Sequence, residues 1–162
     1  MIFVTVGNHP QGFVRLLKSL DILAKNKIIN DVFIQIGYSN YRPKYCVYTK
    51  FVGFNEFHRL IKKSDMVITH SGAGSILNAL LYNKPTIVVP RLKKYREHTD
   101  DHQLQIAKAL EKEGKIIAVY DIKDLENAVE KARIFRPKIA KKKASIIKLI
   151  ENYLKEIGFI PE

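Results

Sequence analysis

Cysteine, tryptophan and acidic residues are scarce in this chain of 162 residues. Cys46 is its single cysteine, which excludes an internal disulfide and a multi-cysteine metal site and fits a reducing cytoplasm. No apolar run approaches the roughly 20 residues that a membrane-spanning helix needs. The first residues enter a strand-like run without a basic leader, so we expect a soluble protein without a signal peptide.

The deficit of acidic residues leaves a net charge of +12 at pH 7, and much of this charge is local. Residues 131–148 contain many lysines and arginines and no acidic residue, and apolar residues recur at helical spacing through residues 139–157. This pattern predicts a basic amphipathic helix at about residues 139–157. Its basic face has three interpretations: adsorption to an anionic membrane surface, a solvated face of a helix packed on its own domain, or nucleic-acid binding. Nucleic acid is the least favoured, because no known reader motif accompanies the charge.

Strand-like and helix-like segments alternate along the chain without a linker or an internal repeat, which predicts a single domain over residues 1–162. The expected strands cover residues 2–6, 32–36, 46–52, 66–70, 86–89 and 116–120. The expected helices cover residues 12–25, 55–63, 74–82, 101–113, 122–132 and 139–157. Nearly continuous apolar strands separated by helices predict an α/β fold with a mostly parallel sheet and helices on both faces. Ligands of such sheets bind beyond the carboxyl ends of the strands.

A glycine-rich turn between the strand at 66–70 and the helix at 74–82 has the features of a phosphate-binding cradle. Free backbone N–H groups and the positive end of the helix dipole favour an anion there. Gly72 and Gly74 would let a diphosphate approach the backbone closely. The alternative is an ordinary turn in which Ser71 or Ser75 caps the helix.

The sequence lacks an Asp-x-Asp pair and any cluster of metal-ligating residues, so we expect no metal ion and no cofactor. A departing diphosphate would then need protein groups to stabilise its charge. The helix N-terminus at Gly74 and the cations Arg91, Lys93, Lys94 and Arg96 are the available groups. These cations are equally compatible with a solvated surface loop.

Ordered motifs in residues 1 to about 120 carry a family resemblance. They are Met-Ile-Phe-Val-Thr-Val-Gly at the start, His-Ser-Gly-Ala-Gly-Ser-Ile-Leu-Asn-Ala-Leu, Lys-Pro-Thr-Ile-Val-Val-Pro and Asp-His-Gln-Leu-Gln-Ile-Ala. The set resembles the glycosyltransferase family 28 C-terminal domain, the Rossmann-like donor-binding half of GT-B enzymes. It is especially similar to the small catalytic subunits of two-part enzymes that build exopolysaccharides or lipid-linked oligosaccharides.

The resemblance implies a role for each matching residue. The donor diphosphate would be held by Gly7, Asn8, Ser71, Gly72, Ala73, Gly74 and Ser75. The nucleobase would be held by Phe51, Val52, Gly53 and Phe54, although Phe54 is also compatible with a core aromatic. His102 and Gln103 would read the donor sugar, whereas Asp100 or Asp101 would cap their helix in either case.

Asn78 departs from the family pattern, in which a glutamate accepts hydrogen bonds from the ribose hydroxyls. An amide oxygen still accepts one, although more weakly than a carboxylate. The alternative is a polar residue on an exposed helix face. His9 is a candidate catalytic base or phosphate contact, because its unperturbed pKa lies near neutrality. His70 is compatible with a packing role.

The resemblance also implies a function and partners. The chain would be the donor-binding subunit of an inverting UDP-sugar glycosyltransferase that transfers a hexose or N-acetylhexosamine to a lipid-linked acceptor. A separate membrane-anchored subunit would bind that acceptor and recruit this cytoplasmic chain to the membrane. The alternative is a non-catalytic UDP-sugar-binding or regulatory module.

Overall fold

The computed structural model describes residues 1–138 together with residues 148, 151 and 155. Its strands are β1 (Ile2–Thr5), β2 (Val32–Gln35), β3 (Val47–Thr49), β4 (Met66–Thr69), β5 (Thr86–Val88) and β6 (Ile117–Ala118). Its α-helices are α1 (Val14–Lys25), α2 (Phe54–Lys63), α3 (Ala73–Leu81), α4 (His102–Lys112) and α5 (Leu125–Ile134). The basic helix expected at residues 139–157 lies outside the described residues, save for the three isolated positions.

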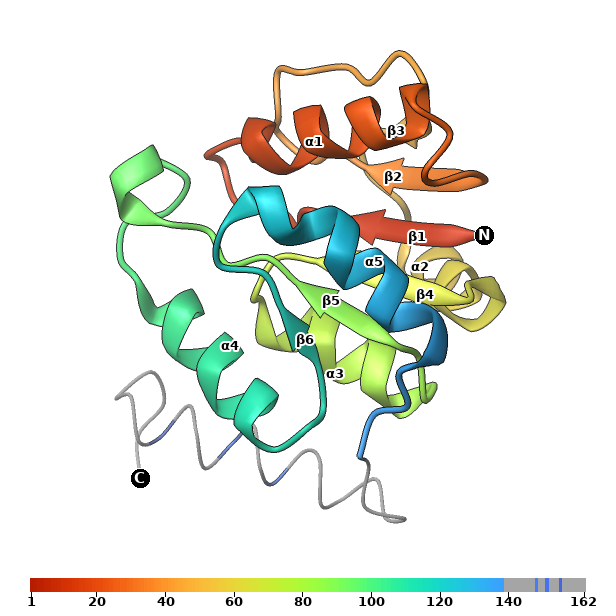
Figure 1. Cartoon of the computed structure of the whole chain (residues 1–162). Coiled ribbons are helices and arrows are strands. Elements are labelled where there is room, and N and C mark those ends of the chain that lie inside the picture. The colour runs from red at the N-terminus through yellow and green to blue at the C-terminus, as the bar shows by residue number, and fades with distance from the viewer. Residues whose placement is uncertain (139–147, 149–150, 152–154, 156–162) are drawn as a thin grey trace.

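The six strands form one sheet in the order β3-β2-β1-β4-β5-β6 (Figure 1). Every pairing is parallel; for example, Phe3 of the central strand β1 lies opposite Phe33 of β2 and Val67 of β4. All the carboxyl ends therefore meet at one edge of the sheet. The expected parallel α/β fold is confirmed, and this edge is where its loops gather.

Helices cover both faces of the sheet, which makes three layers (Figure 1). Successive side chains of a strand point to opposite faces. Ile2 and Val4 thus share a core with apolar residues of α1 and α5, whereas Phe3 packs with residues of α2 and α3 on the other face. A third cluster joins α3 and α4 over Val88 of β5. These buried faces fix the position of the edge loops.

Several elements are shorter than the sequence predicts. β3 ends at Thr49, and Phe51 lies beyond the strand and packs against Tyr38 with ring centroids 5.0 Å apart. β6 is reduced to two residues. The 3₁₀ turn Lys93–Tyr95 was not expected from the apolar pattern, and the helix expected at residues 122–132 begins with a 3₁₀ turn, Ile122–Asp124, before α5.

Candidate functional site

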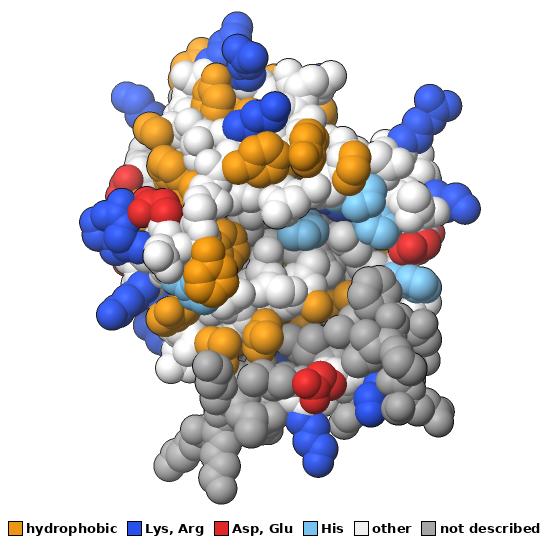
Figure 2. Space-filling view, turned by 180° about the vertical axis from the view of Figure 1, so that it is seen from behind, with side chains coloured by type: hydrophobic (Ala, Val, Ile, Leu, Met, Phe, Trp, Pro, Cys, Tyr) orange, Lys and Arg blue, Asp and Glu red, His pale blue; other side chains and the backbone are white. Residues whose placement is uncertain are grey.

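A cavity of ≈ 440 Å³ opens at the carboxyl edge of the sheet. Its walls come from the loop after β1, the start of α2 and the start of α3. The lining residues are Thr5, Gly7, Asn8, Gln35, Val52, Phe54, Phe57, His58, His70, Gly74, Ser75 and Asn78. Figure 2 shows hydrophobic and histidine side chains around the centre of one face of the molecule. We refer to this space as the edge cavity.

The N-terminus of α3 opens toward the edge cavity. The helix begins at Ala73 with Gly72 as its N-cap, the Ser71 hydroxyl has no hydrogen-bond partner, and no side chain caps the helix. The alternative in which Ser71 or Ser75 caps the helix is therefore wrong. A Cβ atom at Gly74 would meet no atom within 4 Å, so the space beside the first-turn amides is open. This geometry is suited to an anion, since the amides of a first helical turn have no partner within the helix.

His70 forms an inner wall of the edge cavity and is held between two glycines. A Cβ atom at Gly7 would lie 2.5 Å from His70 Cε1, and a Cβ atom at Gly72 would overlap His70 Nε2. Gly7 also has a φ of +74°, which side chains rarely adopt. Gly7 and Gly72 thus make room for the His70 imidazole. From the sequence, we explained these two glycines only by contact with the diphosphate.

Burial keeps His70 uncharged. Desolvation, with a smaller effect of the nearby Arg91 cation, lowers the pKa of His70 from 6.5 to about 3. The ring contacts Thr69 Oγ1 through Nδ1 at 3.2 Å. His70 is therefore a packed histidine, as the sequence allowed, and also a neutral polar group on the cavity wall.

The residues predicted to hold the nucleobase divide into two groups. Val52 and Phe54 line the edge cavity, and Gly53 is the N-cap of α2. Phe51 lies outside this lining and packs on Tyr38. Phe54 is 78% exposed and contacts His58 with ring centroids 4.5 Å apart, so its alternative as a core aromatic is wrong.

Asn78 lines the edge cavity one helical turn after Gly74. Its Nδ2 donates to the Gly74 carbonyl at 2.8 Å. This bond fixes the orientation of the Asn78 amide and occupies its donor. Oδ1 is left to accept a hydrogen bond from a ligand hydroxyl. The ribose assignment stays a prediction.

Gln103 and His102 do not line the edge cavity. Gln103 is buried, and its Oε1 accepts the backbone N–H groups of Ser71 at 3.2 Å and Arg91 at 3.1 Å. Asp101 is the N-cap of α4 and makes no side-chain capping bond, whereas Asp100, one residue earlier, accepts the amide of His102 at 3.0 Å. The Gln103 carbonyl is thus committed to the protein, and a sugar contact would fall to its amide nitrogen.

His9 lies in a histidine cluster beside the edge cavity rather than in its lining. Its ring packs on His98 with centroids 4.6 Å apart, and His98 Nδ1 lies 3.2 Å from Asp100 Oδ1. Desolvation, with smaller effects of the neighbouring His98 and Arg91, lowers the pKa of His9. Its Nδ1 accepts the Gln11 amide at 3.3 Å, which places the proton of the neutral ring on Nε2. This tautomer favours donation to a phosphate over removal of a proton.

The expected role of Arg91 as a free cation is wrong. Arg91 is fully buried, and its guanidinium donates to backbone carbonyls, so it faces no ligand space. Lys93, Lys94 and Arg96 are exposed on the same loop. The charge pattern of the sequence could not distinguish the buried Arg91 from its three exposed neighbours.

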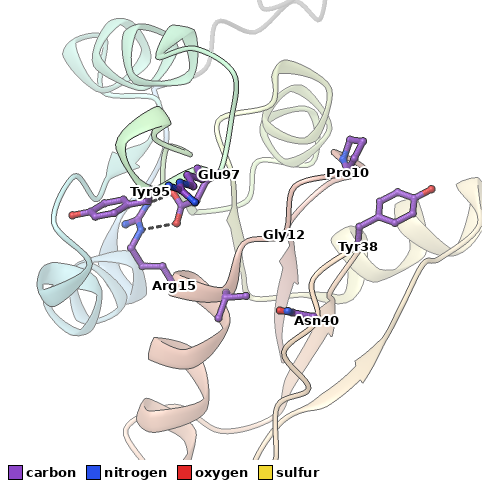
Figure 3. Close-up of a pocket in the computed structure, with 9 residues that line it drawn as sticks. Pro10, Gly12, Arg15, Tyr38, Asn40, Tyr95 and Glu97 are labelled. Atoms are coloured by element: carbon purple, nitrogen blue, oxygen red, sulfur yellow. Dashed lines mark hydrogen bonds and ion pairs between the residues drawn. The ribbon is translucent and has the colours of Figure 1, made fainter.

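A second cavity, of ≈ 490 Å³, shares the loop after β1 (Figure 3). Pro10 and Gly12 lie on one side of it, and Arg15 pairs with Glu97 on the other, with two N–H···O bonds of 2.9 Å. Sequence reasoning missed this ion pair, because the partners are far apart in the chain. It also missed Gln35 at the end of β2, although its position at a strand end was a usable signal.

In residues 1–138 and the three isolated positions, no group of three or more His, Cys, Asp or Glu side chains could hold a metal ion. Over the same residues, no helix has the length and apolarity needed to span a bilayer.

The parallel sheet with helices on both faces defines a Rossmann-like domain, in which the edge cavity lies beyond the carboxyl ends of the strands. The chain belongs to the glycosyltransferase family 28 C-terminal domain family, whose model matches residues 1–157. The resemblance seen in the sequence motifs is therefore confirmed.

Curated relatives carry transferase names. The UDP-N-acetylglucosamine transferase subunit ALG13 of Cryptococcus neoformans is 44% identical over 78 residues, which cover 47% of this chain and 36% of the relative. Human ALG13 is 32% identical over 71% of this chain and 10% of its own. A Prochlorococcus marinus pyrophosphoryl-undecaprenol N-acetylglucosamine transferase is 34% identical over 79% of this chain and 35% of its own. The match thus spans about a third or less of these relatives.

Solved structures support the fold. The solution structure of ALG13 has a TM-score of 0.60 at 20% identity and covers 91% of this chain and 93% of that one. The glycosyltransferase of kitacinnamycin has a TM-score of 0.61 at 16% identity, over 97% of this chain and 40% of that one. At these identities the likeness establishes architecture alone.

Proposed function

We propose that this chain is the donor-binding subunit of an inverting glycosyltransferase that uses a UDP-sugar. The observation that carries the proposal is the edge cavity, in which the open N-terminus of α3, the space beside Gly74 and the uncharged His70 lie together. A diphosphate matches these groups, because backbone amides and a neutral imidazole N–H donate to anionic oxygens without a metal. Val52 and Phe54 offer an apolar surface for the base.

UDP-N-acetylglucosamine is the first donor to consider. The ALG13 relatives are named as subunits of a UDP-N-acetylglucosamine transferase, and the bacterial relative is also an N-acetylglucosamine transferase. A lipid-linked acceptor is consistent with the undecaprenol in the bacterial name.

The acceptor half would be a separate polypeptide. Support comes from the ALG13 relatives, which are named as subunits of a UDP-N-acetylglucosamine transferase. We propose a membrane-anchored acceptor subunit that recruits this chain to the cytoplasmic face of the membrane. The exposed basic residues of the chain would favour an anionic leaflet.

In the proposed reaction, an acceptor oxygen attacks the anomeric carbon from the face opposite the diphosphate. The bond from that carbon to the β-phosphate oxygen breaks, UDP leaves, and the acceptor proton passes to a base. The N-terminus of α3 stabilises the charge that grows on UDP. We assign to His9, with its proton on Nε2, the role of a contact to the phosphate or to the acceptor.

Calorimetric titration with UDP, UDP-glucose, UDP-galactose and UDP-N-acetylglucosamine tests the donor assignment. We expect binding of UDP and a preference among the sugars; no binding of any of the four contradicts it. Co-expression with a membrane-anchored partner then tests catalysis. UDP binding without sugar transfer in the complex would favour a non-catalytic module.

A further inference from the structure

Arg91, which follows β5, is the largest fully buried side chain of the edge loops. Its Nη2 donates to the Val6 carbonyl at 2.6 Å, and its Nη1 donates to the carbonyls of Gln11 at 2.6 Å and Gly12 at 3.2 Å. Nη1 also donates to the Glu97 carbonyl at 3.1 Å. One guanidinium therefore joins both ends of the loop after β1 to the loop after β5.

This burial is costly, because a charged group without a direct carboxylate partner loses its hydration. Desolvation lowers the pKa of Arg91 to about 10, while Glu97 opposes the shift, so the guanidinium is still charged at neutral pH. Carbonyl dipoles and the Phe13 ring, 4.9 Å from Cζ, replace part of its water, while Nε is buried without a hydrogen-bond partner. An apolar side chain would fill this space more cheaply, which indicates a role in fixing the loops.

Gln103 extends the connection to the cradle. Its Oε1 accepts the amides of Arg91 and Ser71, so one oxygen spans the loop after β5 and the turn before α3. Glu97 secures the far side, because its carboxylate accepts the Leu92 amide and pairs with Arg15 of α1 (Figure 3). Through these contacts, the loops after β1, β4 and β5 are tied together around buried groups.

We propose that Arg91 and the Gln103 carbonyl are positioning groups that hold these three loops in their binding geometry before the ligand arrives. The proposal rests on the proposed function, since it takes UDP as the ligand. Arg91 acts without touching UDP, and it requires the planar fork of the guanidinium rather than its charge alone. Loss of either group leaves the binding geometry populated for a smaller fraction of the time, and the apparent affinity falls by that fraction.

The test compares Arg91→Lys and Gln103→Met with the parent chain by calorimetry, with UDP as the probe. UDP lacks the transferred sugar of the donor, so a contact of Gln103 with that sugar cannot contribute. Gln105→Met is the matched control, because Gln105 is exposed on the same helix. We expect about a tenfold or larger loss of affinity in both variants if the competent geometry falls to about a tenth, and no change in the control.

Arg91→Lys keeps the positive charge but loses the planar guanidinium, so it distinguishes the effect of geometry from the effect of charge. If Arg91→Lys binds UDP as the parent does, charge alone suffices and the proposal is overturned for Arg91. If Arg91→Lys fails to fold, Gln103→Met decides, and an unchanged UDP affinity there overturns the proposal. The melting temperature of Gln103→Met must show a folded domain at the titration temperature.

Amide hydrogen exchange without ligand keeps this claim distinct from the donor assignment. In Gln103→Met, we expect faster exchange at Gly7 and Gln11 of the loop after β1. The Gly7 amide bonds to Thr5 at the end of β1, the Gln11 amide bonds to His9, and neither touches Gln103. Unchanged exchange at both amides contradicts the coupling of the loops. If the parent chain binds no UDP, the proposed function fails, and this exchange result alone decides the positioning role.

Discussion

Replacement of Gly74 by valine should separate donor binding from folding. Gly74 is exposed in the first turn of α3, its φ is outside the left-handed range, and a Cβ atom there would meet nothing within 4 Å. Valine also has a better helix propensity than glycine, by roughly 0.3–0.5 kcal/mol. The domain should therefore fold with unchanged or slightly higher stability.

The same branch would fill the space in which a diphosphate meets the first-turn amides. A hydrogen bond to a charged group contributes about 1.5–3 kcal/mol, so the loss of two such bonds weakens UDP binding by about a hundredfold or more. Calorimetry with UDP measures the loss, and urea denaturation measures the stability. A Gly74→Val chain that binds UDP as tightly as the parent would refute the phosphate assignment.

Gly72→Ala is the matched control two residues earlier. Its Cβ would overlap His70 Nε2, so the ring or the turn must move. Overpacking of this kind costs about 1–3 kcal/mol. We expect Gly72→Ala to lower the free energy of unfolding, in contrast to Gly74→Val. Equal stability of the two variants would show that His70 is not confined between glycines.

Three further outcomes follow from the edge cavity. Asn78→Ala should weaken UDP binding by about 1 kcal/mol, the value of one neutral hydrogen bond, and Asn78→Glu should match or exceed the parent; equal affinities for all three would place Asn78 away from the ribose. His70 has a folded pKa of about 3 against 6.5 unfolded, so its contribution to stability is complete above pH 6.5 and is lost as the pH falls toward 3. The slope is up to about 1.4 kcal/mol per pH unit, and urea titrations at pH 7 and 5 should show a larger loss of stability in the parent than in His70→Gln, which keeps only the smaller contribution of groups such as His9. The isolated chain should bind UDP but transfer sugar only with its acceptor partner, because one half cannot align an acceptor oxygen with the anomeric carbon; transfer by the purified chain would contradict the two-subunit proposal.

The strands and helices were predictable where apolar periodicity is strong. Met66–Thr69 is four buried residues in a row, and the pattern predicted a strand there. The shorter β3 was not predictable, since its Val47 and Tyr48 are exposed at the sheet edge and give no burial signal. The order of the strands depends on pairings between distant segments, which local pattern does not encode.

The cradle could be found from the sequence because its glycines, strand and helix are contiguous. The roles of Gly72 and Arg91 could not, since each depends on contacts made by folding. Gly72 shares the His70 ring with Gly7, 65 positions earlier, and Arg91 bonds to Val6 across 85 positions. From the sequence, Arg91 was therefore interpreted as a surface cation, whereas in the structure it is buried and donates to backbone carbonyls.

The central claim is that the edge cavity binds the diphosphate of a UDP-sugar at the N-terminus of α3. A backbone-amide NMR titration of the isotopically labelled chain with UDP tests it most directly. The claim predicts saturable shifts at Ala73, Gly74 and Ser75, with smaller ones at Asn8 and Val52. An absence of shifts, or shifts confined to residues around the second cavity near Arg15, would contradict it.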